Sequence, residues 1–362
     1  MGIITFRLDM FSISGSVLLV GNSIEGEAKR VLEPSEVKEL FQRSDAFNKY
    51  ASKQKIYEFG EYLFELVFAH DLGRLFASTQ GALTDGDVLQ IFLRIGSPEL
   101  ASVLWEIMRE ENNFIGHTYR FIRYPMIRKR RSENIAVKRP AKMLIVAASP
   151  PAPSFPQLDI TRELDAVERA VANLEDRVQV TKLVEPNATF ENIDRELKKR
   201  PDVFHFIGHG DYNPKDPESS YLVIDEGESE ESSSAGRLPL SSISATLALS
   251  PTNMLFLNAC KTAGGESQTI NENFVNMAYE LIRLGNRCVI AMSHNISDTG
   301  AILLSSGFYK GVFKDLEPID LVLTRCKNDL YTRIAQGKTD QMDWCSPVLY
   351  TRVEKLQMLD TN

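Results

Sequence analysis

Two apolar segments of this chain each stop at a side chain that can take part in catalysis. The segment VFHFIGHG ends with His209 between two glycines, and the segment NMLFLNAC ends with Cys260. A thiol attacks as its thiolate, and a neighbouring imidazole can take the proton or stabilise the ion pair, which lowers the pKa of the thiol. If the fold brings them together, the two residues predict nucleophilic catalysis with Cys260 as the nucleophile and His209 as its base.

The residues around this pair can supply the other groups that acyl transfer needs. The backbone N–H groups of Gly210 and Cys260 are natural donors to an oxyanion. His205 is an alternative base, but it lies inside the apolar run, where we expect a histidine to pack against the sheet. A cysteine or a histidine alone at such a position is usually structural. The prediction therefore depends on the presence of both.

The segments that must position these two residues belong to a regular alternation in the second half of the chain. Short apolar runs of strand character alternate there with amphipathic helical patterns. This alternation predicts a parallel sheet covered by helices on both faces, with ligands binding at its carboxyl edge. His209 and Cys260 both fall at that edge. The predicted strands are 143–149, 178–184, 203–208, 253–259 and 288–293, and the predicted helices are 159–175, 189–200 and 271–285.

The first half of the chain is predicted to form a separate domain of mixed α/β character. A chain of 362 residues favours two hydrophobic cores over one. The basic, Pro-containing segment 129–142 is predicted to be a solvated linker rather than a nucleic-acid site, giving an N-terminal regulatory domain at 1–135 and a catalytic domain at 136–362. The first domain is expected to have one or two strands within 3–21, helices within 35–77, strands near 87–96 and 117–128, and a helix at 97–110.

Composition and motifs argue against several classes of protein. The net charge of −8, from 41 basic and 49 acidic residues, disfavours binding to nucleic acid or to an anionic membrane. Four cysteines without a CxxC pair predict reduced thiols and a cytoplasmic protein. No apolar run is long enough to span a membrane. Phosphate-binding glycine motifs, an HExxH zinc motif and a GxSxG serine elbow are absent from the sequence, so no metal or cofactor is predicted.

Several motifs, in the order found here, resemble the CHAT family of caspase-like cysteine proteases, which are related to separase and the caspases. HFIGHG resembles the family's histidine motif and MLFLNACKTAGG its cysteine motif, separated by about 50 residues as in caspases. LQIFLRIGSPELASVLWEIMRE is similar to the strand and helix that carry its Pro-Trp-Glu motif, and DWCSPVLYTR to its closing strand. The resemblance covers residues 85–352 approximately and implies a caspase-like three-layer α/β sandwich with a mostly parallel sheet.

This resemblance implies peptide-bond hydrolysis by a Cys260–His209 dyad that needs no third catalytic side chain. Gly210 and Cys260 would then hold the oxyanion through their backbone N–H groups. By analogy with the family, it also implies a regulated effector protease in bacterial defence or cell-death signalling. Such an enzyme acts on a protein substrate and is controlled by an activating or inhibiting protein partner.

The substrate pocket is predicted less directly than the dyad, because the chain departs from the family pattern at Leu104, Lys261 and 292–294. Asp211 could orient His209 or attract a basic side chain of the substrate. Further candidates lie at the end of the last predicted strand or after it, where a loop contact without a role is equally consistent with the sequence. These candidate substrate-binding residues are Ser293, His294 and Asp298.

Other interpretations of the same residues stay open. The acidic, Ser-rich segment 225–237 is predicted to be a mobile surface loop, with a cleavage, phosphorylation or calcium-dependent switch as the alternative. The caspase-like domain could be a catalytically silent module that recruits a partner protein, or its thiol could serve another acyl transfer such as transpeptidation. The intact GHG and NAC motifs favour the protease.

Overall fold

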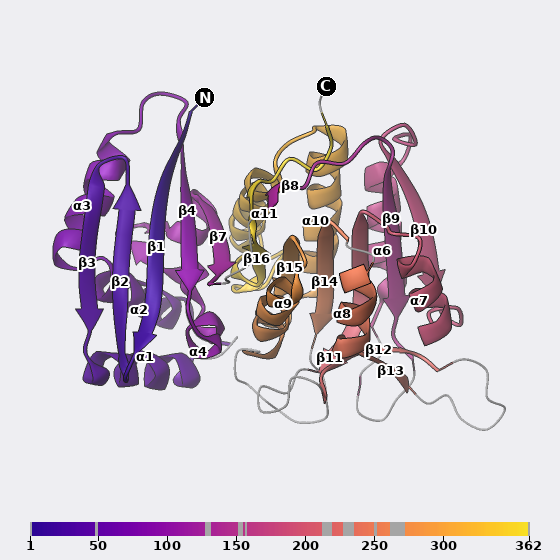
Figure 1. Cartoon of the computed structure of the whole chain (residues 1–362), viewed down its shortest axis with the longest axis horizontal. Helices are drawn as coiled ribbons and strands as arrows, with labels where there is room; N and C mark the ends of the chain where they lie inside the picture. Colours follow the sequence, from indigo (N-terminus) through magenta and orange to yellow (C-terminus); the bar gives the residue numbers. More distant parts are fainter. Residues whose placement is uncertain are drawn as a thin grey trace. The chain divides into compact units, whose positions relative to one another are not determined.

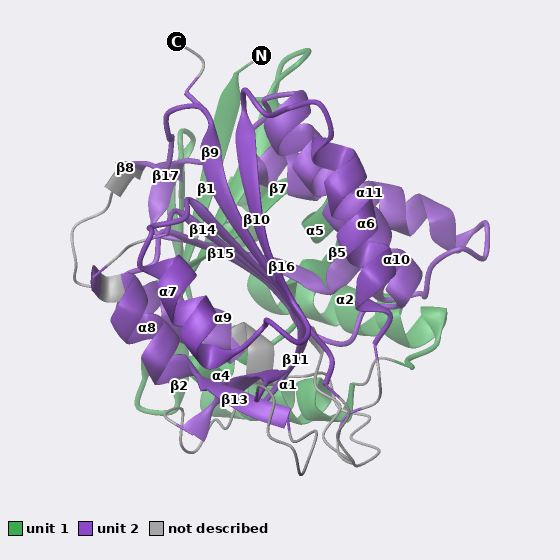
Figure 2. Ribbon diagram, turned by 90° about the vertical axis from the view of Figure 1, so that its right-hand side faces the viewer, with its two compact units in different colours: residues 1–128, 268–270 green, residues 129–267, 271–362 purple. Residues whose placement is uncertain are grey.

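The structure is a computed structural model that divides into two compact units. Among the described residues, those up to Met126 form the first unit and those from Ser132 onward form the second (Figure 2). The domain limits predicted above and the regulatory role of the first domain stay predictions. The described residues are 2–47, 50–126, 132–150, 155, 158–211, 219–226, 235–249, 252–260 and 272–360.

The first unit is built on a mixed sheet with the strand order β7-β4-β1-β2-β3 (Figure 1). β1 pairs antiparallel with β2 and parallel with β4. Alternate residues of β1, among them Phe6, Leu8 and Met10, are buried, as expected for a sheet with one packed face. The ring of Phe6 lies edge-on to Phe76, with 5.2 Å between ring centroids. The strands are β1 (Ile3–Ile13), β2 (Ser16–Ser23), β3 (Gly26–Leu32), β4 (Val88–Ile95) and β7 (Arg120–Pro125), and the main helices are α1 (Pro34–Ala46), α2 (Lys53–Val67) and α3 (His70–Gly81).

The segment between β4 and β7 differs from its prediction. The helix expected at 97–110 ends at Ser102, after one turn that begins at the predicted cap, where the Ser97 side chain accepts a hydrogen bond from the Leu100 N–H. The chain then turns, and two buried hydrogen bonds hold this turn. The Trp105 indole N–H donates to the carbonyl oxygen of Leu100 at 2.7 Å, and Arg123 Nε donates to the Glu106 carboxylate at 2.9 Å. The short elements here are α4 (Pro98–Ser102), η1 (Trp105–Ile107), β5 (Arg109–Glu110), β6 (Asn113–Phe114) and α5 (Ile115–Thr118).

The second unit is built on a sheet with the strand order β10-β9-β11-β14-β15-β16. All neighbours pair in parallel except β15 and β16, which are antiparallel. The first five are the predicted strands. All of them except the edge strand β10 are mostly buried, which is typical of a sheet covered on both faces. The strands are β9 (Ala141–Ala148), β10 (Val178–Val184), β11 (Val203–Asp211), β14 (Met254–Cys260), β15 (Cys288–Met292) and β16 (Pro347–Thr351).

Helices cover both faces of this second sheet. Figure 2 shows α6, α10 and α11 on one face and α7, α8 and α9 on the other. The predicted three-layer α/β sandwich with a mostly parallel sheet is therefore confirmed. The helices are α6 (Ile160–Val171), α7 (Phe190–Leu197), α8 (Leu240–Leu249), α9 (Glu272–Leu284), α10 (Asp298–Tyr309) and α11 (Ile319–Ile334), with the π-helical turn η3 (Lys310–Lys314) and the 3₁₀ turn η4 (Asp343–Cys345).

Two segments that were predicted to be irregular contain strand residues in the structure. In 225–237, Asp225 ends β12 and Ala235 begins β13, and the two strands pair antiparallel; residues 227–234 lie outside the described part. In 129–142, β8 pairs with β17 near the end of the chain. No helix among the described residues is long and apolar enough to cross a membrane. These strands are β8 (Ser132–Asn134), β12 (Tyr221–Asp225), β13 (Ala235–Pro239) and β17 (Val353–Lys355).

Candidate active site

The backbone register of β11 and β14 brings the two predicted catalytic residues side by side. These strands are parallel neighbours, and the Cα of His209 pairs with the Cα of Cys260, the last residue of β14. Adjacent strands of a sheet lie about 4.8 Å apart. The side chain of Cys260 and residues 261–271 lie outside the described part of the structure.

The imidazole of His209 is buried against an aromatic ring. Its exposed fraction is 0%, and the ring of Phe155 stacks on it at 5.2 Å between centroids, with 26° between the planes. Phe155 was not singled out from the sequence. In the described structure the ring of His209 is covered, and its orientation is restricted by packing.

The residues that follow His209 are held by β12. Gly210 pairs with Leu222 and Asp211 with Tyr221, in antiparallel register. Asp211 is half-buried at the end of β11. The oxyanion role of Gly210 and the substrate role of Asp211 stay predictions, now placed on a strand rather than in a free loop.

Ser293 and His294 lie at the end of β15 in a buried hydrogen-bond network. The Ser293 hydroxyl lies 3.0 Å from Nδ1 of His294, whose Nε2 lies 2.9 Å from the carbonyl oxygen of Met342. The Ser346 hydroxyl donates to the carbonyl oxygen of His294 at 2.6 Å. Both residues are at most 2% exposed. These contacts hold the loop that leads into α10, and the substrate-binding role of the pair stays a prediction.

Asp298 begins α10 and lines a small pocket near the strand ends. The helix is capped by Ser297, whose hydroxyl accepts from the Gly300 N–H at 3.0 Å and donates to the carboxylate of Asp343 at 2.6 Å. The backbone N–H of Ser297 donates to the same carboxylate at 2.9 Å. Asp343 therefore anchors the start of α10 and positions Asp298.

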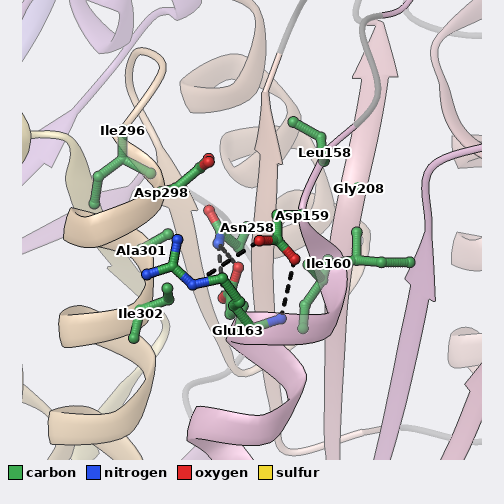
Figure 3. Close-up of a pocket in the computed structure, with 12 residues that line it drawn as sticks. Leu158, Asp159, Ile160, Glu163, Gly208, Asn258, Ile296, Asp298, Ala301 and Ile302 are labelled. Atoms are coloured by element: carbon green, nitrogen blue, oxygen red, sulfur yellow. Dashed lines mark hydrogen bonds and ion pairs between the residues drawn. The ribbon is translucent and has the colours of Figure 1, made fainter.

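The pocket lies between the first turns of α6 and α10 and beside the ends of β11 and β14, with a volume of about 50 Å³ (Figure 3). Ile207, two residues before His209, and Asn258, two residues before Cys260, form part of its wall. Three carboxylates and one guanidinium line it, which makes the lining negative when all are ionised. These charged residues are Asp159, Glu163, Asp298 and Arg162, and Arg162 is an exposed side chain 3.9 Å from Asp159.

Glu163 forms the floor of this pocket. It lies in the first turn of α6 and is 5% exposed, and its carboxylate accepts from Asn258 Nδ2 at 2.8 and 2.7 Å and from the Ser305 hydroxyl at 2.6 Å. Burial raises the pKa of Glu163 to about 7; the two hydrogen-bond donors oppose this shift and the charge of Asp298 adds to it. Neither Glu163 nor Asn258 was singled out from the sequence.

The raised pKa of Glu163 predicts a stability change between mildly acidic and mildly basic pH. The folded state binds the proton more tightly than the unfolded state, so this stabilising contribution is present below about pH 4.5 and is lost as the pH rises through about 7. In Glu163→Gln the contribution does not titrate. We expect the free energy of unfolding of wild type, relative to the variant, to fall by up to about 3 kcal/mol between about pH 5 and pH 8.5.

Urea unfolding of both proteins at the two pH values measures this change. Glu168→Gln is the matched control, because Glu168 is on the same helix, is partly exposed and pairs with Lys182. It should show the pH dependence of wild type. An equal difference between wild type and Glu163→Gln at both pH values would contradict the prediction.

His205, the alternative base, is packed inside the unit. It is 0% exposed, and its ring lies 4.8 Å from Phe256 and 5.4 Å from Tyr309 between centroids. Burial lowers the pKa of His205 to about 3, so its imidazole is neutral near pH 7. This agrees with the expectation that His205 packs against the sheet.

In the described residues, no cluster of three or more His, Cys, Asp or Glu could hold a metal ion.

Comparison with known proteins identifies the family of the chain. No curated protein sequence matches it significantly. Separase of Saccharomyces cerevisiae, solved in the separase–securin complex, is similar at 10% identity and a TM-score of 0.49, over 96% of this chain and 30% of the separase chain. The Arg-specific cysteine proteinase gingipain R is similar at 10% identity and a TM-score of 0.46, over 87% of this chain and 70% of the other. The chain thus spans less than a third of the separase chain.

The family comparison covers more of the chain than the sequence motifs did. The family model described as the CHAT domain matches residues 58–352. The match begins within α2 of the first unit and ends just after β16, so the family sequence is not confined to the second unit. The matched residues make up most of the chain. The chain belongs to the CHAT domain family.

Proposed function

We propose that this chain is a cysteine endopeptidase in which Cys260 attacks the scissile carbonyl and His209 takes and returns the proton. The observation that carries the proposal is the register of β11 and β14, which pairs the two Cα atoms at the carboxyl ends of neighbouring parallel strands. Sheets of this kind bind ligands at that edge. The N–H groups of Gly210 and Cys260 are the donors proposed for the oxyanion.

The substrate residue before the scissile bond is proposed to be Lys or Arg. The pocket beside the strand ends has three carboxylates against one guanidinium, which favours a cationic side chain. Among the earlier candidates for substrate binding, Asp298 is the one that lines this pocket.

The biological setting is proposed from the family. We infer a cytoplasmic effector protease of bacterial defence or cell-death signalling that cuts a protein substrate and is controlled by a protein partner. Buried thiols at Cys288 and Cys326, which form no disulfide among the described residues, support a reducing compartment. The covered imidazole of His209 supports control by a partner, because packing around His209 must change before a peptide can reach it.

A peptide probe with a thiol-directed electrophile tests the dyad directly. Three other thiols compete poorly, since they are buried and burial raises the pKa of Cys326 to about 12 and that of Cys288 further still. We expect intact-mass analysis to show one adduct, mapped to Cys260 and lost in Cys260→Ala.

The same experiment separates the protease from a silent recruiting module. Labelling is measured with the protein alone and with lysate of its natural host added, so that a latent enzyme can be released. An adduct at Cys260 in either condition supports the dyad. Failure to label Cys260 in both conditions, with adducts only at other cysteines, favours the recruiting module.

A further inference from the structure

Glu163 controls how the amide of Asn258 is presented to the pocket. Both carboxylate oxygens accept from the same Asn258 nitrogen, at 2.8 and 2.7 Å (Figure 3). An ionised carboxylate only accepts hydrogen bonds, so it selects the amide orientation in which Nδ2 faces Glu163. The Ser305 hydroxyl, which donates to the same carboxylate at 2.6 Å, holds Glu163 in place from α10.

This orientation leaves the amide oxygen of Asn258 without a hydrogen-bond donor among the described residues. Oδ1 is buried, and the whole side chain is 5% exposed while lining the pocket. A buried acceptor without a donor is costly, and a ligand that brings a donor removes the cost. Asp159 and Asp298 line the same pocket and favour a donor that carries positive charge.

We propose that Glu163 is a positioning residue that holds the Asn258 amide oxygen toward the pocket and thereby selects substrates with a Lys or Arg side chain there. The pocket's role in peptide cleavage rests on the proposed function. Glu163 acts through Asn258 in this arrangement, because both of its oxygens already accept a hydrogen bond from the Asn258 amide and one also accepts from Ser305.

Protonation of Glu163 should weaken this selection. A protonated carboxyl can donate to the amide oxygen of Asn258, so the amide can turn and present its N–H₂ group to the pocket. The pocket also loses one negative charge. Because burial raises the pKa of Glu163 to about 7, the preference for a cation should fall between mildly basic and mildly acidic pH.

The other charged and titratable groups around Glu163 come from each packed element. From β11, His205 Nε2 lies 3.8 Å from Glu163 Oε1 and is neutral near pH 7, since burial lowers its pKa to about 3. From α10, Asp298 acts electrostatically on Glu163, and Tyr309 stays neutral because burial raises its pKa. From α6 itself, Asp159 and Arg162 line the pocket.

A binding experiment that does not require catalysis tests this role. The full chain carrying Cys260→Ala is labelled at the isoleucine δ1 methyl groups and titrated, by NMR, with n-butylguanidinium and with its uncharged isostere n-butylurea. Four isoleucines line the pocket and report binding there: Ile160, Ile207, Ile296 and Ile302. We expect the guanidinium to bind at least about tenfold more tightly than the urea near pH 8, and this ratio to fall at least about threefold near pH 6.

Substitution of Glu163 should remove most of this selectivity. In Glu163→Gln we expect a guanidinium-to-urea ratio of about two or less, equal at both pH values, because a glutamine can donate to Asn258 Oδ1 and carries no charge. Asn258→Leu removes the acceptor itself and should lower the ratio similarly, which keeps the test valid if one variant misfolds. Glu168→Gln should keep the wild-type ratio and its pH dependence.

Two results would overturn the inference: equal binding of the two ligands near pH 8, or a ratio that Glu163→Gln leaves unchanged. Either result leaves probe labelling of Cys260 unaffected. Conversely, a protein that never labels at Cys260 can still show the selective pocket, so failure of the protease proposal is distinguished from failure of this one.

Discussion

Replacement of His209 by Asn will slow alkylation of Cys260 by the peptide probe about 30-fold near pH 7, because the proton acceptor of the thiol is removed. The thiol must then ionise alone, with a pKa of about 8.5. The deficit should shrink to less than about tenfold near pH 9.5, where most of the thiol ionises unaided. Alkylation rates measured by intact mass from mildly acidic to strongly basic pH give the whole profile.

The shape of this pH profile separates a catalytic role from a structural one. Misfolding would lower reactivity at every pH, whereas loss of the base is compensated at high pH. His70→Asn is the matched control, since His70 is an exposed residue of the first unit whose φ of 58° is well tolerated by Asn. It should react at the wild-type rate. A His209→Asn protein that alkylates Cys260 as fast as wild type near pH 7 would refute the dyad.

Removal of the charge of Arg123 will destabilise the first unit by about 3–5 kcal/mol, because it leaves the carboxylate of Glu106 buried without its partner. The ion pair between these residues is 0% and 1% exposed. Arg123 Nε donates to Glu106 Oε1 at 2.9 Å, Nη1 to the carbonyl oxygen of Ala101 at 2.6 Å, and Nη2 to that of Val103 at 3.0 Å. One guanidinium therefore ties β7 to α4, to η1 and to Val103 between them.

Denaturant unfolding of Arg123→Met measures this loss, with Arg74→Met as the control for an exposed pair. Arg74 and Asp71 are 80% and 63% exposed, and a pair of this kind contributes at most about 1 kcal/mol. The double variant Arg123→Met with Glu106→Gln should recover part of the stability, since the unpaired charge is gone. A loss in Arg123→Met no larger than that in Arg74→Met would show that the buried pair does not support the fold.

Local sequence patterns predicted most of the second unit because its elements bury their apolar residues at regular spacing. The runs that became β9, β11, β14 and β15 are mostly apolar and buried, and α6 buries Leu164, Val167 and Val171 on one face. Prediction was poorer where local preference competed with distant contacts. The helix expected at 97–110 stops at Ser102, and Glu106 pairs instead with Arg123, 17 residues away.

The sequence by itself determined the fold class, five strands of the second unit's sheet and the two residues proposed for catalysis, because strand runs and the side chains that end them are local features. Only the tertiary structure decided that Phe155 covers His209 and that Glu163 and Asn258 line one pocket, with the Ser305 hydroxyl donating to Glu163. Glu163 and Asn258 are 95 residues apart, and Glu163 and Ser305 are 142 apart. Hydrogen bonds over such separations leave no spacing in the sequence, since they depend on how α6, α10 and β14 pack together.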